Sequence, residues 1–125
     1  MDQYIFNIQS NVLSQLKIWH WQYTAFSSHV AIGELYESLS DILDTVVETW
    51  QGRTQSRIKI GQLERAPHVD FEGAEQAIEL LSDAVEQTVA QVAELKKLDA
   101  FSDVINLLEE LNGILGKTMY LLTLK

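Results

Sequence analysis

Apolar residues recur every three or four positions over the first part of the chain. They are Ile5, Ile8, Val12, Leu16, Trp19 and Tyr23. This spacing gathers them on one face of an α-helix, so it predicts an amphipathic helix over residues 3–23. The segment from Thr24 to Ser28 is short and rich in small polar residues. It predicts a tight connection in which Ser27 or Ser28 caps the next helix.

A second apolar stripe consists of Ile32, Leu35, Leu39, Ile42, Val46 and Trp50. It predicts a helix that continues to about Gln51 and ends at Gly52, because glycine is common just after a helix. Residues 53–70 have weaker periodicity and contain Gly61 and Pro67. We expect a long connection there, with a short helix near residues 60–65.

The last two stripes follow in the same way and predict helices from Phe71 to Leu98 and from Ala100 to Leu124. The third consists of Ala74, Ile78, Leu81, Val85, Thr88, Val92 and Leu95, and the fourth of Val104, Leu108, Leu111, Leu115, Met119 and Leu122. Two short connections and one long one then join four amphipathic helices. This layout predicts an all-α, antiparallel four-helix bundle, with its long connection between helices 2 and 3.

Composition narrows the class of protein. The 125 residues favour one domain, residues 1–125, and a single proline permits long helices. The absence of cysteine excludes disulfides and thiolate metal sites. The amino terminus lacks a basic region followed by an apolar run, and no apolar stretch is long enough to cross a bilayer. We therefore expect a cytoplasmic protein without membrane contacts.

The net charge of −9 disfavours nucleic acid as a partner, because such a surface repels phosphates on average. Four of the nine basic residues, Arg53, Arg57, Lys59 and Arg65, lie in the long connection. We expect this basic segment to be solvated or to pair with acidic helices. Phosphate contact there is the alternative.

The second predicted helix carries a polar stripe beside its apolar one. It consists of His29, Gly33, Glu37, Asp44 and Glu48. Asp44 and Glu48 are four residues apart, so their charges repel each other across one helical turn. A cation between the two carboxylates would reverse that effect, and imidazole with carboxylate suits iron, manganese or zinc.

These residues cannot form one site within one chain. His29 and Asp44 are 15 residues apart, which is about 22 Å along a helix. If the helix packs antiparallel against its own copy, with a two-fold axis near residues 38 and 39, His29 lies beside a partner Glu48. A tight turn also brings His20 to the level of His29. The predicted site then combines two histidines of one chain with two carboxylates of another.

The same residues resemble a known family, the ferritin-like Dps proteins or miniferritins. The matching positions are His20-Trp21, Phe26, His29, Asp44, Glu48 and Gly52. The resemblance implies a ferritin-like bundle and an intersubunit iron-oxidation site with His20, His29, Asp44 and Glu48 as ligands. Gly33 stands where that family has an acidic residue, and Glu37, one turn on, is the candidate substitute. Iron is the implied metal, with zinc or manganese as alternatives, in a homodimer or a larger oligomer.

A similar pattern, HWQ…H…D…E…QG, occurs in an uncharacterised family of tailed-phage proteins, which implies a bacterial or phage-infected host cell. Two functional hypotheses remain open. The first is a transition-metal-binding protein, and the second is a non-catalytic helical oligomer, a phage accessory protein with a degenerate metal site. The sequence contains no motif typical of a catalytic site. We interpret Trp19, Trp21, Tyr23 and Trp50 as core or interface residues.

Overall fold

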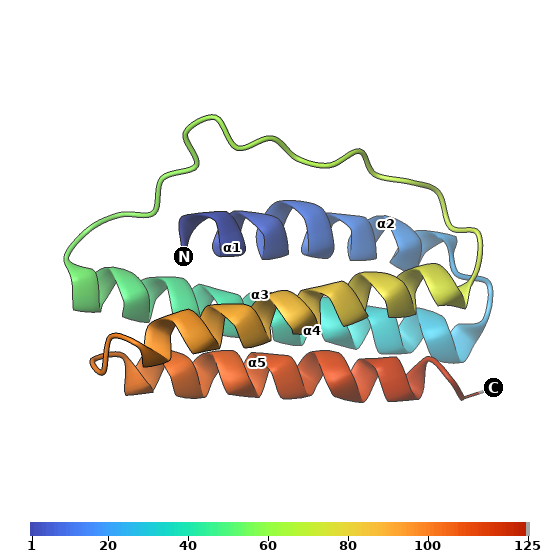
Figure 1. The fold of residues 1–125 in the computed structure, drawn as a ribbon. Coiled ribbons are helices and arrows are strands. Elements are labelled where there is room, and N and C mark those ends of the chain that lie inside the picture. Colours follow the sequence, from blue (N-terminus) through green and yellow to red (C-terminus); the bar gives the residue numbers. More distant parts are fainter. Residues whose placement is uncertain (125) are drawn as a thin grey trace.

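The first helix of the bundle is continuous from Asp2 to Gln22. The computed structural model describes residues 1–124 and divides this helix into α1 (Asp2–Phe6), η1 (Asn7–Leu13) and α2 (Ser14–Gln22). The helices α3 (Phe26–Thr54), α4 (Ala74–Lys96) and α5 (Ser102–Leu121) follow (Figure 1). Residues 1–124 contain no strand, so the prediction of an all-α bundle is confirmed.

The helices pack around one apolar core. α3 contacts both α2 and α5, and α4 contacts α5 and the first helix. Fully buried side chains come from every helix, among them Ile8, Leu16, Ile32, Leu39, Leu81, Leu108 and Leu111. None of the helices in residues 1–124 is long and apolar enough to cross a membrane.

The middle of the first helix is a π-helix. Over η1 the hydrogen bonds widen to the i→i+5 pattern, and the flanking α1 and α2 continue the same helical path. The hydroxyl of Ser14 also donates to the carbonyl of Gln9, five residues earlier, at 3.3 Å. The apolar stripe predicted this helix correctly but gave no sign of the wider turn.

Two predictions about the ends of α3 are wrong. Its N-cap is Ala25, which has no side-chain cap, and Ser28 is buried inside the first turn. At the other end Gly52 lies inside the helix, which continues to Thr54. Gln55 ends it in the left-handed conformation, with φ of 55°.

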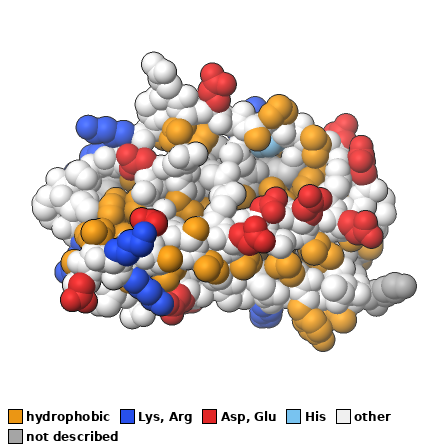
Figure 2. Space-filling model, viewed as in Figure 1, with side chains coloured by type: hydrophobic (Ala, Val, Ile, Leu, Met, Phe, Trp, Pro, Cys, Tyr) orange, Lys and Arg blue, Asp and Glu red, His pale blue; other side chains and the backbone are white. Residues whose placement is uncertain are grey.

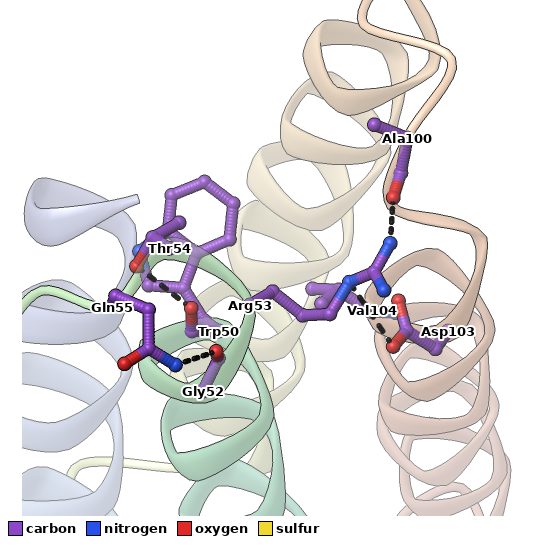
Figure 3. Close-up of polar contacts among 8 residues, drawn as sticks. All are labelled: Trp50, Gly52, Arg53, Thr54, Gln55, Ala100, Asp103 and Val104. Atoms are coloured by element: carbon purple, nitrogen blue, oxygen red, sulfur yellow. Dashed lines mark hydrogen bonds and ion pairs between the residues drawn. The ribbon is translucent and has the colours of Figure 1, made fainter.

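Side chains in the last turn stabilise this longer end (Figure 3). Arg53 donates to the carbonyl of Ala100 and lies 3.6 Å from the carboxylate of Asp103. The Gln55 side chain donates to the carbonyl of Gly52 at 2.7 Å. The Arg53 contacts tie the end of α3 to the start of α5, and the Gln55 bond closes the last turn of α3.

The connection between α3 and α4, residues 55–73, is here called the strap. It runs along the bundle from one end to the other (Figure 1). The predicted short helix near residues 60–65 is wrong, because only a turn interrupts the strap at Gly61 and Gln62. Gly61 has a φ of 51°, which a glycine adopts without steric cost.

Polar side chains of the first helix hold the strap in place. Gln15 pairs with the backbone of Val69 through two hydrogen bonds of 2.9 and 2.8 Å, and the Trp19 indole donates to the same carbonyl at 2.9 Å. Asn11 accepts from the amide of Ala66 at 2.9 Å. These three side chains are spaced four residues apart, so one helix face satisfies the backbone of an extended segment.

The aromatic residues divide between core and surface. Trp19 and Tyr23 are buried, and Trp50 is partly buried with its ring centroid 4.9 Å from that of Phe101. Trp21 is 67% exposed, so its interpretation as a core residue is wrong. An interface role for Trp21 stays a prediction.

Candidate metal site

The turn between α2 and α3 brings the two predicted histidine ligands together. The chain leaves α2 after Gln22 and enters α3 at Phe26, with only residues 23–25 between the helices. The imidazole rings of His20 and His29 then stack with their centroids 3.9 Å apart and their planes 16° from parallel. The expectation that a tight turn sets the histidines at one level is confirmed.

Each histidine is anchored by the backbone of the other. His20 Nδ1 lies 2.8 Å from the carbonyl oxygen of His29, and His29 Nδ1 lies 2.6 Å from the carbonyl oxygen of His20. A carbonyl only accepts, so both Nδ1 atoms carry the proton. In the neutral rings each Nε2 therefore holds a lone pair. No hydrogen bond within residues 1–124 engages either Nε2 atom.

The ring of His20 packs directly against Gly33. A Cβ atom placed on Gly33 would lie 2.7 Å from Cε1 and 3.1 Å from Nδ1 of His20. Real Cβ atoms do not approach other atoms so closely, so a larger residue would displace the ring. The absence of an acidic residue at this position thus has a structural reason in this chain.

The three candidate carboxylates lie apart from the histidine pair. Glu37, Asp44 and Glu48 are all exposed on α3, and this helix is unbroken between His29 and Glu48. Among residues 1–124, no group of three or more histidine, aspartate or glutamate side chains is close enough to hold one metal ion. The structure therefore brings His20 and His29 together within one chain but leaves the carboxylates separate from them.

The exposed charged residues of α3 between residues 34 and 48 are all acidic. No lysine or arginine occurs between Lys17 and Arg53, and the five acidic residues in that interval are all exposed: Glu34, Glu37, Asp41, Asp44 and Glu48. None of them takes part in an ion pair within residues 1–124. Two copies of this face would repel each other unless cations lay between them.

A family model described as a family of unknown function (DUF5856) matches residues 20–122. The chain belongs to this family. The matched range begins at His20 and includes every candidate ligand. No curated protein and no solved structure matches the chain.

The DUF5856 chain also has polar features that the sequence patterns did not reveal. The ammonium group of Lys17 on α2 lies 4.7 Å from the ring centroid of Tyr36 on α3. His68 lies in the strap, with its Nε2 atom 3.1 Å from the carbonyl oxygen of Ser10. Asp44 lines a pocket formed by the first helix, α3 and the strap. These contacts join segments far apart in the chain, and a pattern along one helix does not show them.

Proposed function

We propose that the protein binds a transition metal ion through His20 and His29, with iron as the first candidate and zinc or manganese as alternatives. The observation that carries this proposal is the reciprocal anchoring of the two imidazoles. Histidines that bind metals typically donate their second ring N–H to a carbonyl or carboxylate, which fixes the tautomer and the ring orientation. Both rings here have that arrangement, with Nε2 left as the donor atom.

The ligand set is incomplete within one chain, so the proposal includes a second copy. Antiparallel pairing of α3 about a two-fold axis near residues 38 and 39 sets a partner Glu48 beside His29 and a partner Asp44 beside Gly33. Two imidazoles and two carboxylates then surround one ion, and Glu37 lies one turn away as a further ligand. This geometry is the intersubunit site that the resemblance to Dps proteins implies.

The acidic face of α3 disfavours this pairing unless cations reduce the repulsion between the two copies. Ten exposed carboxylates would approach one another in the dimer, because each copy contributes the same five. A divalent cation on each side of the two-fold axis reduces this repulsion, so we infer that metal binding and dimer formation are coupled. The long strap between α3 and α4 supports a ferritin-like arrangement of the helices, which is part of the same proposal.

Metal content tests the proposal directly. The untagged protein is loaded with Fe(II), Zn(II) or Mn(II) in turn and dialysed, and the bound metal per chain is measured. We expect one ion per chain for the unchanged protein and none for the double variant His29→Ala with Glu48→Ala. The matched control is Glu75→Ala with Glu86→Ala, two exposed carboxylates of α4 that should leave the content unchanged. Absence of bound metal in the unchanged protein would refute the proposal.

A second candidate function has its own supporting observation. The carbonyl of His20 lies in the last turn of α2, where no intrahelical donor is left for it, and His29 supplies one. The histidine pair therefore also links α2 to α3 through its two hydrogen bonds. The alternative function is a helical oligomer or phage accessory protein, in which the histidine pair links the two helices and binds no metal. It predicts that His29→Ala lowers the free energy of unfolding by about 1 kcal/mol while no metal is bound by any variant.

A further inference from the structure

A pocket of about 370 Å³ lies beside α3, at the side where the first helix and the strap meet it. Three segments form its walls, and its apolar part includes Ile5 of α1, Leu43 of α3 and Ile58 of the strap. Leu43 and Ile5 are buried core residues, and Ile58 packs against the core. The pocket thus has a firm apolar floor, and its volume lies within the range of small-molecule sites.

Two carboxylates border this pocket. Asp41 and Asp44 lie three residues apart on α3, and both are exposed lining residues. Neither takes part in an ion pair within residues 1–124. A partly apolar pocket that carries two carboxylates outside any ion pair complements a molecule with an apolar body and a positive head.

We propose that this pocket binds a small organic ammonium compound. Its apolar body packs against Ile5, Leu43 and Ile58, and its ammonium group lies between the carboxylates of Asp41 and Asp44. The strap closes one side through Ile58 and Ile60. The amide of Ile58 donates to the Gln51 side chain at 3.0 Å, which fixes this part of the strap to the end of α3. The site is separate from the histidine pair, which lies in the turn between α2 and α3.

The test uses 2-phenylethylamine, with 2-phenylethanol as a neutral molecule of the same shape. Amide chemical shifts of the isotope-labelled protein are followed during each titration, in buffer containing a chelator so that no metal contributes. We expect the amine to bind with a dissociation constant of about 1 mM, as for other small ligands. The shifted amides should come from α1, η1, the middle of α3 and the strap. The alcohol should bind at least fivefold more weakly.

Variants then test the two halves of the site. Asp41→Asn keeps the side-chain shape and should weaken amine binding about tenfold, as expected for a charge-assisted contact, without affecting the alcohol. Ile60→Ser changes a half-exposed residue of the strap and should weaken both ligands. Asp83→Asn, an exposed carboxylate of α4, is the control and should change neither.

The proposal is overturned if the amine does not bind, if the alcohol binds equally well, or if the shifted amides lie elsewhere. It is also overturned if Asp41→Asn and Asp83→Asn have the same effect. Asp44 belongs to this pocket and to the proposed metal site, so the variants avoid it. The chelator makes the result independent of the metal proposal.

Discussion

Because glycine has no Cβ atom, Gly33 leaves room for the His20 ring and so determines the geometry of the histidine pair. The His20 ring occupies the space that a Cβ atom of residue 33 would need, so the reciprocal hydrogen bonds of the histidine pair depend on glycine there. The resemblance to Dps proteins marked Gly33 only as the position of a missing acidic ligand. The structure gives Gly33 a role in placing the ring of His20.

Gly33→Ala and Gly113→Ala should have different effects on stability. Both positions are helical, so both substitutions gain about 0.5–1 kcal/mol of helix propensity. Nothing lies within 4 Å of a Cβ atom at Gly113, whereas the Gly33 variant must move the His20 ring and lose its bond to His29. We expect Gly113→Ala to raise the free energy of unfolding in urea and Gly33→Ala to leave it unchanged or lower. Equal stabilisation by both would show that the ring is not held there.

The burial of Tyr4 determines how the free energy of unfolding should change at alkaline pH. Thr88 donates its hydroxyl proton to the carbonyl of Ala84 at 2.7 Å, so Tyr4 is the donor in its 2.8 Å bond to Thr88. Desolvation by burial raises the pKa of Tyr4 to about 12. The unfolded chain loses this proton near pH 10, while the folded protein retains it until about pH 12.

The contribution of Tyr4 to the free energy of unfolding should therefore be constant below pH 10 and fall between pH 10 and 12. The expected slope from this residue is about 1.4 kcal/mol per pH unit. Burial also raises the pKa of Tyr23, which adds to the fall. Urea unfolding at several pH values should show a smaller slope for Tyr4→Phe. The exposed Tyr120→Phe variant is the control. An unchanged slope in Tyr4→Phe would contradict the buried, proton-donating role of Tyr4.

Among the elements of the fold, the strap is the one whose structure apolar periodicity predicts least well. Its backbone lacks regular secondary structure, and amide side chains of the first helix provide the missing partners. Gln15 is only 4% exposed and satisfies both the amide and the carbonyl of Val69. The strap therefore depends on a few side-chain bonds and is the element most easily detached.

Gln15→Ala should loosen the strap while the helices stay folded. The amide of Val69 loses its partner, and the expected cost is about 1–2 kcal/mol. Limited trypsin digestion should then cleave after Arg65 several times faster than in the unchanged protein. Circular dichroism should show the same helix content. Asn106→Ala, at an exposed position of α5, is the control, and equal cleavage of both variants would contradict the proposed role of Gln15.

The elements also show which features a single sequence can predict. Apolar periodicity gave the four helices, because each must bury one stripe in the same core. It missed the end of α3, since Gln55 rather than a glycine adopts the left-handed conformation and Arg53 extends the helix through contacts with α5. The turn length placed His20 beside His29. The stacking, the tautomers and the contact with Gly33 depend on packing that spacing does not encode.

On the scale of the whole molecule, charge is distributed unevenly. On one face, basic side chains lie mostly over the half where α4 ends, whereas acidic side chains lie over both halves (Figure 2). The exposed face of α3 is acidic over residues 34–48, so a metal-free dimer through this face is unfavourable. The mass of the protein in solution should therefore depend on divalent metal and on ionic strength.

Complementation between two inactive variants tests the shared site most directly. One chain carries His20→Ala with His29→Ala, and the other carries Asp44→Asn with Glu48→Gln. Each variant alone should bind no metal and remain monomeric in sedimentation velocity, because each homodimer lacks one half of both sites. An equimolar mixture should form dimers on addition of Fe(II) or Zn(II), with one ion per dimer. The account is contradicted if the mixture binds no more metal than the separate variants, or if either variant binds metal alone.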